Sequence, residues 1–203
     1  YYRQPQIYIK LPSKGKYYPA DVFTPTETGE IPVLPMTAKD ELAFKTPDAM
    51  ISGQATVDVI QSCIPNLKDA WKMVNYDTDA ILLAIRIATY GETMDITFNE
   101  MTHTVNLPAI LEEFGRIEVR DTATTKKGFK FKVAPLDYKS LTAVQVAQFE
   151  QQKIYVTVNN SAMTEDQKSS QFAKSFTVLN NINFGMLVDS ITEITTPAGD
   201  TVT

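Results

Sequence analysis

The sequence predicts an α+β fold, with a helical core, a short N-terminal β arm or hairpin, and a small antiparallel β subdomain inserted between helices. Between Ile31 and Gly91, signals that start and stop helices follow one another. From Thr93 the spacing of apolar residues changes from helical to alternating, and helical spacing returns at Ser140. A chain of 203 residues can bury a core and form one domain or two small ones. We expect the arm at 1–36, the helical core at 37–92 and 139–203, and the β subdomain at 93–138.

The N-terminal arm is predicted to contain short strands. Apolar and polar residues alternate from Gln6 to Leu11, which is typical of a half-buried strand. Pro12 to Gly15 is predicted to turn, and Ile31 to Leu34 to form a brief extended segment that prolines interrupt.

The first helix of the core is predicted after Thr37, a residue type that caps helices. Asp40 and Glu41 fall in its first turn, where the helix dipole favours acidic side chains. The helix should end near Lys45, because the residue before Pro47 avoids helical backbone angles. Pro47 itself suits the first position of a second short helix.

A third helix is predicted from an apolar stripe at helical spacing that stops before Pro65. The stripe consists of Val59, Ile60, Cys63 and Ile64. Cys63 is the single cysteine, so the chain cannot form an internal disulfide, and we expect a buried, inert thiol.

A fourth helix is expected to be capped by Asp77 and to end at Gly91. It is apolar on nearly all sides from Ala80 to Ala88, which indicates a helix in the middle of a core. We expect its charged residue, Arg86, to pair with an acid such as Asp58 or Asp79 rather than to make a functional contact.

The β subdomain is predicted from alternation. Met94 to Phe98 and Thr104 to Leu107 should form a hairpin, followed by a short helix from Pro108 to Phe114. Ile117 to Arg120 and Phe129 to Val133 should form two further strands around a turn.

Two long helices are predicted near the C-terminus. The first should run from Ser140 to about Val158, although the β-branched segment Ile154 to Val158 also suits a strand. The second begins with the capping-box spacing of Thr164 and Gln167 and should run to about Asp189. Alternation returns at Ile191 to Thr195.

Charge and composition exclude several classes of protein. A formal net charge of −5 argues against a nucleic-acid partner, because phosphate binding needs clustered basic residues. One basic cluster is interpreted as a solvated strand face rather than a phosphate-binding patch: Lys126, Lys127, Lys130 and Lys132. The longest apolar run is far shorter than the roughly 20 residues that span a bilayer, so we expect no membrane insertion. Because the chain opens at Tyr1 without an initiator Met, we expect a portion of a longer protein.

The residue types that carry catalysis are sparse. His103 is the single histidine, so neither a nucleophile–histidine pair nor a zinc site has enough partners, and His103 is interpreted as a solvated residue of the hairpin turn. No phosphate-binding glycine loop is present. The carboxylate pairs Glu112/Glu113 and Asp77/Asp79 are explained by surface and cap positions. We therefore expect no enzyme, no cofactor and no small-molecule substrate.

Aromatic residues crowd the start of the chain, before any helix that could bury them. Tyrosine is enriched at protein interfaces, where one part of the ring is apolar and the hydroxyl is wet. The alternative is that these rings cover the helical core. The predicted partner-interface residues are Tyr1, Tyr2, Arg3, Tyr8, Tyr17, Tyr18 and Phe23.

Several short motifs occur together in one order. They are Tyr2 to Pro5, Leu11 to Gly15, Pro32 to Glu41, Lys45 to Ala49, and Ala84 to Gly91. In these segments the chain resembles the baseplate hub subunit family of T-even-like contractile-tailed bacteriophages. The resemblance is strong from Tyr2 to Asp95 and weaker, mainly in pattern, to Thr203.

That resemblance implies a structural component of the central hub of a phage tail baseplate, located in the virion and, during assembly, in the host cytoplasm. Its partners would be other baseplate and tail proteins, in multiple copies within a symmetric assembly. The alternative is a hub assembly factor that leaves before the particle matures, and a tail-associated cell-wall hydrolase is a third, disfavoured hypothesis.

Other members of that family carry paired cysteines in the hairpin that follows the Tyr90-Gly91 motif, consistent with a zinc knuckle. The corresponding turn, Asn99 to Thr102, has no cysteine. A metal role is therefore not implied for this chain, and we expect the hairpin to be held by packing alone.

Overall fold

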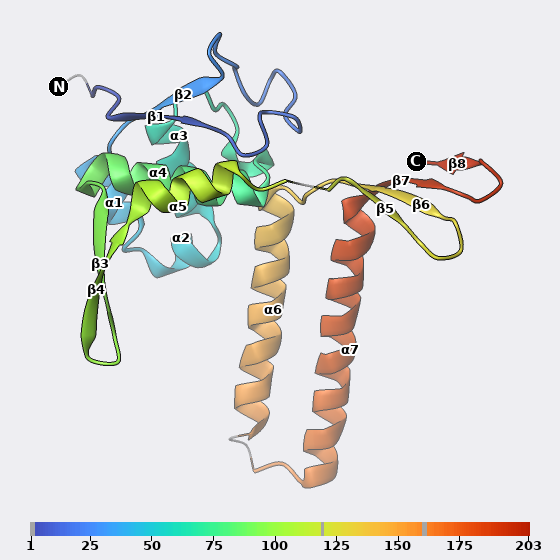
Figure 1. Ribbon diagram of the computed structural model, residues 1–203. Coiled ribbons are helices and arrows are strands. Elements are labelled where there is room, and N and C mark those ends of the chain that lie inside the picture. The colour runs from blue at the N-terminus through green and yellow to red at the C-terminus, as the bar shows by residue number, and fades with distance from the viewer. Residues whose placement is uncertain (1–2, 119, 160–161) are drawn as a thin grey trace. The chain divides into compact units, whose positions relative to one another are not determined.

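The computed structural model describes residues 3–118, 120–159 and 162–203. The chain divides into two compact units, Tyr1–Val119 and Arg120–Thr203 (Figure 1). In the first unit the elements are β1 (Ile7–Lys10), β2 (Glu30–Val33), α1 (Ala38–Ala43), α2 (Pro47–Ile51), α3 (Gln54–Cys63), the 3-10 helix η1 (Ala70–Lys72), α4 (Asn75–Tyr90), β3 (Thr93–Phe98), β4 (Met101–Asn106) and α5 (Leu107–Gly115). In the second unit they are β5 (Thr122–Thr124), β6 (Lys130–Val133), α6 (Tyr138–Asn159), α7 (Glu165–Ser190), β7 (Ile191–Thr195) and β8 (Thr201–Val202). Helices combined with small antiparallel sheets confirm the α+β class.

The N-terminal arm is part of the core of the first unit. β1 pairs antiparallel with β2, so that Ile9 lies opposite Ile31. Ile9, Leu11, Ile31 and Val33 are buried, whereas Tyr8 between them is exposed, as alternation along a strand requires. The arm thus buries its apolar side within its own chain.

The short helices begin where the sequence predicts. The Thr37 hydroxyl accepts a hydrogen bond from the Asp40 backbone N–H, and the Asp40 carboxylate accepts one from the Thr37 N–H, which completes a capping box on α1. α2 begins at Pro47, as expected. In α3 the predicted stripe is fully buried, including Cys63.

The prediction that Asp77 caps α4 is wrong. α4 begins two residues earlier, at Asn75, and its N-cap residue Val74 makes no side-chain capping bond. Asp77 is fully buried in the first turn, where its carboxylate binds Ser13 and Tyr18 from the N-terminal segment. The capping prediction was wrong because an acidic side chain in the first turn of a helix can instead make buried hydrogen bonds to residues that are distant in sequence.

Arg86 does not pair as expected. Its guanidinium lies 4.6 Å from the centre of the Tyr90 ring, one turn along α4. Among the described residues, no ion pair joins it to Asp58 or Asp79, and Asp58 instead accepts a hydrogen bond from Gln54. A cation over an aromatic face replaces the predicted salt bridge.

β3 and β4 form a hairpin whose turn is tighter than predicted. Asn99 and Glu100 alone connect the strands, with φ angles of 49° and 62°. Positive φ at both positions matches the mirror-image turn that suits the twist of a two-residue hairpin. α5 follows directly, as predicted, and the Asn106 side chain caps it by accepting from the Ala109 N–H.

The remaining strands join one four-stranded antiparallel sheet in the order β5-β6-β7-β8, separate from the β3–β4 hairpin. The strands expected within 93–138 therefore belong to two sheets. The predicted strand at Ile117 to Arg120 is wrong for its described residues, and Val119 lies outside the described residues. The tight turn between Thr125 and Phe129 instead pairs the residues that flank it, starting with Thr124 and Lys130. The expectation that 37–92 and 139–203 share one helical core stays a prediction.

α6 and α7 form a long antiparallel helical hairpin in the second unit (Figure 1). The helical prediction for Ile154 to Val158 is confirmed over the strand alternative. α6 starts slightly earlier than Ser140, because the Asp137 carboxylate accepts from the Ser140 N–H. The capping box of Thr164 and Gln167 opens α7 as predicted.

Candidate interaction surfaces

Of the seven predicted interface residues, Tyr1 and Tyr2 lie outside the described residues. Arg3 binds within its own unit: its guanidinium donates to the backbone oxygens of Ser62 at 2.8 Å and Pro35 at 3.0 Å. It also lies 3.5 Å from the carboxylate of Asp40, which is 7% exposed. Arg3 thus ties the arm to the end of α3 and the start of α1.

Tyr18 belongs to a buried network around Asp77. The Tyr18 hydroxyl donates to Asp77 Oδ2 at 2.8 Å and accepts from the Val74 N–H at 3.0 Å. The Ser13 N–H donates to Asp77 Oδ1 at 2.8 Å, and the Ser13 hydroxyl donates to Oδ2. Five polar groups satisfy one another in this buried or part-buried network, which fixes the N-terminal segment against α4.

Burial controls the ionisation of this network. It raises the pKa of Asp77 above its ordinary value of 3.8, and the hydrogen bonds from Ser13 and Tyr18 oppose that rise without cancelling it. The pKa of Tyr18 is also raised, first by burial and then by the adjacent Asp77 charge. Tyr18 therefore stays a neutral donor.

The other predicted interface residues differ in exposure. Phe23 is buried, at 9% exposure, and Tyr17 is half-buried under the Lys16 ammonium, 5.5 Å from its ring centre. Tyr8 is 62% exposed on the outer face of β1. The interface role of these residues stays a prediction, with Tyr8 the most accessible described member.

A groove of about 680 Å³ lies beside the arm in the first unit. Its walls include Leu11, Tyr18 and Phe23, with Lys10 and Lys14 at its edge. The described lining contains no carboxylate, histidine or cysteine. The groove thus offers an apolar contact surface without a pair of groups suited to acid–base chemistry.

The β3–β4 hairpin has two chemically opposite faces that the sequence interpretation missed. One face is polar and internally bonded, with Thr104 donating to Asp95 at 2.6 Å. The register places the following residues together on the other face: Met94, Ile96, Phe98, Met101, His103 and Val105. Exposure reaches 66% at Phe98, 59% at Met101 and 44% at Ile96. Strict alternation in Thr93 to Phe98 was the signal that could have identified this face.

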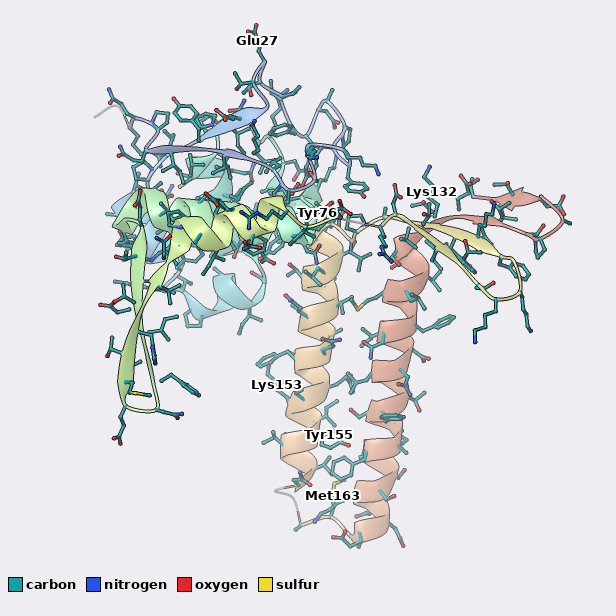
Figure 2. The ribbon with its side chains drawn as sticks, viewed as in Figure 1. Glu27, Tyr76, Lys132, Lys153, Tyr155 and Met163 are labelled. Carbon is teal, nitrogen blue, oxygen red and sulfur yellow. The ribbon has the colours of Figure 1, made fainter. Side chains whose placement is uncertain are left out.

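The second unit also exposes apolar side chains. Among the described residues, Val158 is its only buried apolar side chain. Large apolar side chains with substantial exposure on the two helices are Phe149, Ile154, Tyr155, Val156, Phe176, Val178, Phe184, Leu187 and Val188. Tyr155 reaches toward α7, where its ring stacks on Phe172 at 4.4 Å between centroids (Figure 2). The helical hairpin therefore leaves many of its large apolar side chains exposed.

Metal-binding groups do not gather in the part of the chain that the structure describes, where no three His, Cys, Asp or Glu side chains are placed to share an ion. The strands on either side of the Asn99–Glu100 turn are joined by a backbone ladder and by the bond from Thr104 to Asp95. Within the same described ranges, none of the helices combines the length and the apolar character that a membrane crossing needs.

Comparison with known proteins gives one match. The sequence profile of a family described as T4 bacteriophage base plate protein matches residues 4–203, which includes nearly all of both units. No curated protein and no solved structure matches the chain. A match over nearly the whole length of the chain identifies the family. The chain belongs to the T4 bacteriophage base plate protein family.

Proposed function

We propose that this chain is a structural component of the central hub of the baseplate, acting through contacts with other tail proteins and not by catalysis. Membership of the baseplate family supports a place in the phage tail. The hub assignment is supported by the motifs shared with hub subunits, such as Pro32 to Glu41 and Ala84 to Gly91. The observation that carries the proposal is the exposed apolar face of the β3–β4 hairpin.

An isolated two-stranded hairpin is marginally stable in water, because it has no second layer to cover its apolar face. Here the pair of strands joins no other strand of the described chain. Covering the exposed parts of Ile96, Phe98 and Met101 would contribute about 1–2 kcal/mol for each side chain. A partner protein that covers this face would stabilise both the hairpin and the complex.

The partner is expected to be another baseplate protein with an apolar surface, in an assembly that contains several copies of this chain. The hairpin contributes little charge, since its acids are Asp95, which lies on the polar face, and Glu100, which lies in the turn. Nucleic acid would not fit such a surface, because phosphate binding requires basic groups. Assembly would take place in the host cytoplasm and end in the virion.

The test is a paired substitution on the apolar face, Phe98→Thr with Met101→Thr. Threonine keeps the strand propensity and removes the large apolar groups. We expect the variant to keep its helical circular dichroism and to lose co-purification with hub proteins from infected cells. The matched control, Thr97→Ser with Thr102→Ser on the polar face, should co-purify as the wild type does.

Stoichiometry in purified tails tests the structural role itself. We expect a fixed number of copies in every mature particle, measured by quantitative mass spectrometry. A chain present in assembly intermediates and absent from mature tails would be an assembly factor. Wall-degrading activity of the purified chain would instead support the hydrolase hypothesis and overturn the proposal.

A further inference from the structure

α7 carries an exposed, mainly apolar stripe beside the side that contacts α6. Its members are Ala173, Phe176, Asn180, Phe184 and Leu187. With about 100° between successive residues, all five lie within about 40° of the direction of Asn180. Phe176, Phe184 and Leu187 are 61%, 67% and 58% exposed. The stripe is therefore a real surface of the second unit.

Contacts with α6 occupy a different side of α7. The Ser175 hydroxyl donates to Gln151 at 2.9 Å, and Phe172 stacks on Tyr155. Ser175, which is 2% exposed, points about 140° away from Asn180 around the helix, and Phe172 about 80° away. Asn183, which accepts a hydrogen bond from Gln148 of α6, lies about 60° away. The stripe thus borders the α6 contact, which leaves its three large side chains mostly exposed.

The positions of the stripe are spaced symmetrically about Asn180. Ala173 and Leu187 lie seven residues on either side of it, and Phe176 and Phe184 lie four residues on either side. A two-fold axis through Asn180 would place Phe176 against Phe184 of a second copy, and small Ala173 against large Leu187. Such an interface must be self-complementary, with every contact made twice.

The polar centre of the stripe also suits a second copy. An asparagine amide has both donors and an acceptor, so two Asn180 side chains on the axis can bond to each other. A single asparagine in an apolar helix stripe is a known means of fixing register. Between Glu165 and Asp189 the charged residues of α7 are Asp166, Lys168 and Lys174. The two lysines point about 120° away from Asn180, and Asp166 would face a position of the second copy beyond the end of α7 at Ser190. No like charges would therefore oppose each other along the paired helices.

We propose that α7 pairs antiparallel with α7 of a second copy of this chain, about a two-fold axis at Asn180. The exposed parts of the three large side chains amount to roughly 350 Å² per copy, estimated from the area of aromatic side chains. Stable complexes bury about 800 Å² per partner, so the pair is expected to be weak in dilute solution. The pairing does not depend on a hub role for the protein.

Disulfide trapping of the full chain tests the axis. Asn180→Cys should form a disulfide-linked dimer at least about ten-fold faster than Lys174→Cys, because pairing raises the local concentration of the two thiols. Lys174→Cys is the matched control, exposed on another side of α7. The native Cys63 is fully buried and should not compete. Equal rates for the two variants would overturn the proposal.

A mixing experiment tests the antiparallel direction. Ala173→Cys and Leu187→Cys chains should cross-link when mixed and not when each is alone. Cross-linking of each alone would indicate parallel helices and contradict the proposed axis.

Sedimentation equilibrium provides a measurement without thiols. Phe176→Gln with Phe184→Gln should weaken self-association at least about 100-fold, from the loss of two buried rings per copy. Val178→Gln, on another side of the helix, should not. A wild-type chain that stays monomeric at all concentrations, with no preferential trapping at Asn180, would mean that another protein covers the stripe. The hub role would survive that result, since it depends on the copy number in tails.

Discussion

The hydroxyl of Tyr18 donates a hydrogen bond of 2.8 Å to the buried carboxylate of Asp77, across 59 residues of sequence. The same hydroxyl accepts from the Val74 N–H, which would otherwise be an unpaired donor at the start of α4. The Tyr18 hydroxyl thus satisfies both a backbone donor at the start of α4 and an oxygen of the buried Asp77 carboxylate. The first two predictions concern this pair.

Tyr18→Phe should lower the free energy of unfolding by about 1–3 kcal/mol, because it leaves the Val74 N–H and one Asp77 oxygen without this partner. Urea denaturation followed by circular dichroism measures the change. Tyr8→Phe removes the same atom from a ring that is 62% exposed, and should change stability by less than about 0.5 kcal/mol. Equal effects of the two substitutions would show that the Tyr18 bonds do not matter.

Asp77 should make stability fall as pH rises. Its pKa is raised in the folded state, so the folded protein holds this proton more tightly than the unfolded chain does. The stabilising contribution is complete below the unfolded pKa, near 3.8, and is lost as pH rises through the folded pKa. The free energy of unfolding of wild type minus that of Asp77→Asn should therefore decrease over this window. A difference that increases with pH would contradict the raised pKa.

Arg3→Ala should destabilise the first unit by about 1–3 kcal/mol, since the carbonyls of Ser62 and Pro35 and the buried Asp40 carboxylate lose a charged donor. Thermal unfolding monitored by circular dichroism is the measurement. Lys10→Ala is the control, because its ammonium is largely exposed and lies 4.0 Å from Glu30. A surface pair of that kind contributes about 0–1 kcal/mol.

Glu100→Gly should strengthen the β3–β4 hairpin by about 1 kcal/mol, because glycine adopts the φ of 62° without the steric cost that a side chain brings. Slower amide hydrogen exchange at Phe98 and Met101 would report the gain. Asn99→Gly should have a smaller effect, since asparagine tolerates positive φ better than glutamate. Faster exchange in Glu100→Gly would argue against strain at this turn.

Local signals predicted local structure well. Thr37, Pro47 and Thr164 act on the residues within one helical turn of them, and each starts a helix where expected. Asp77 failed because its partners, Ser13 and Tyr18, are distant in sequence, and no spacing rule connects them.

The candidate surfaces also differ in whether neighbouring residues alone could predict them. The alternation that creates the apolar face of the hairpin is present in the residues from Thr93 to Phe98, so that face could have been predicted. The symmetric spacing of the α7 stripe about Asn180 can also be read from the sequence. Which side of α7 faces α6 could not be predicted, because both sides carry apolar residues and only the packing of Phe172 and Ser175 selects one.

The bond between Ser13 and Asp77 has a consequence for biosynthesis. The two residues are 64 positions apart, so at ordinary rates of translation a ribosome needs about 3–13 s to add Asp77 after Ser13. Throughout that interval the leading segment is without the helix that holds it. Nascent chains that stall before α4 should be the ones that proteases and chaperones recognise.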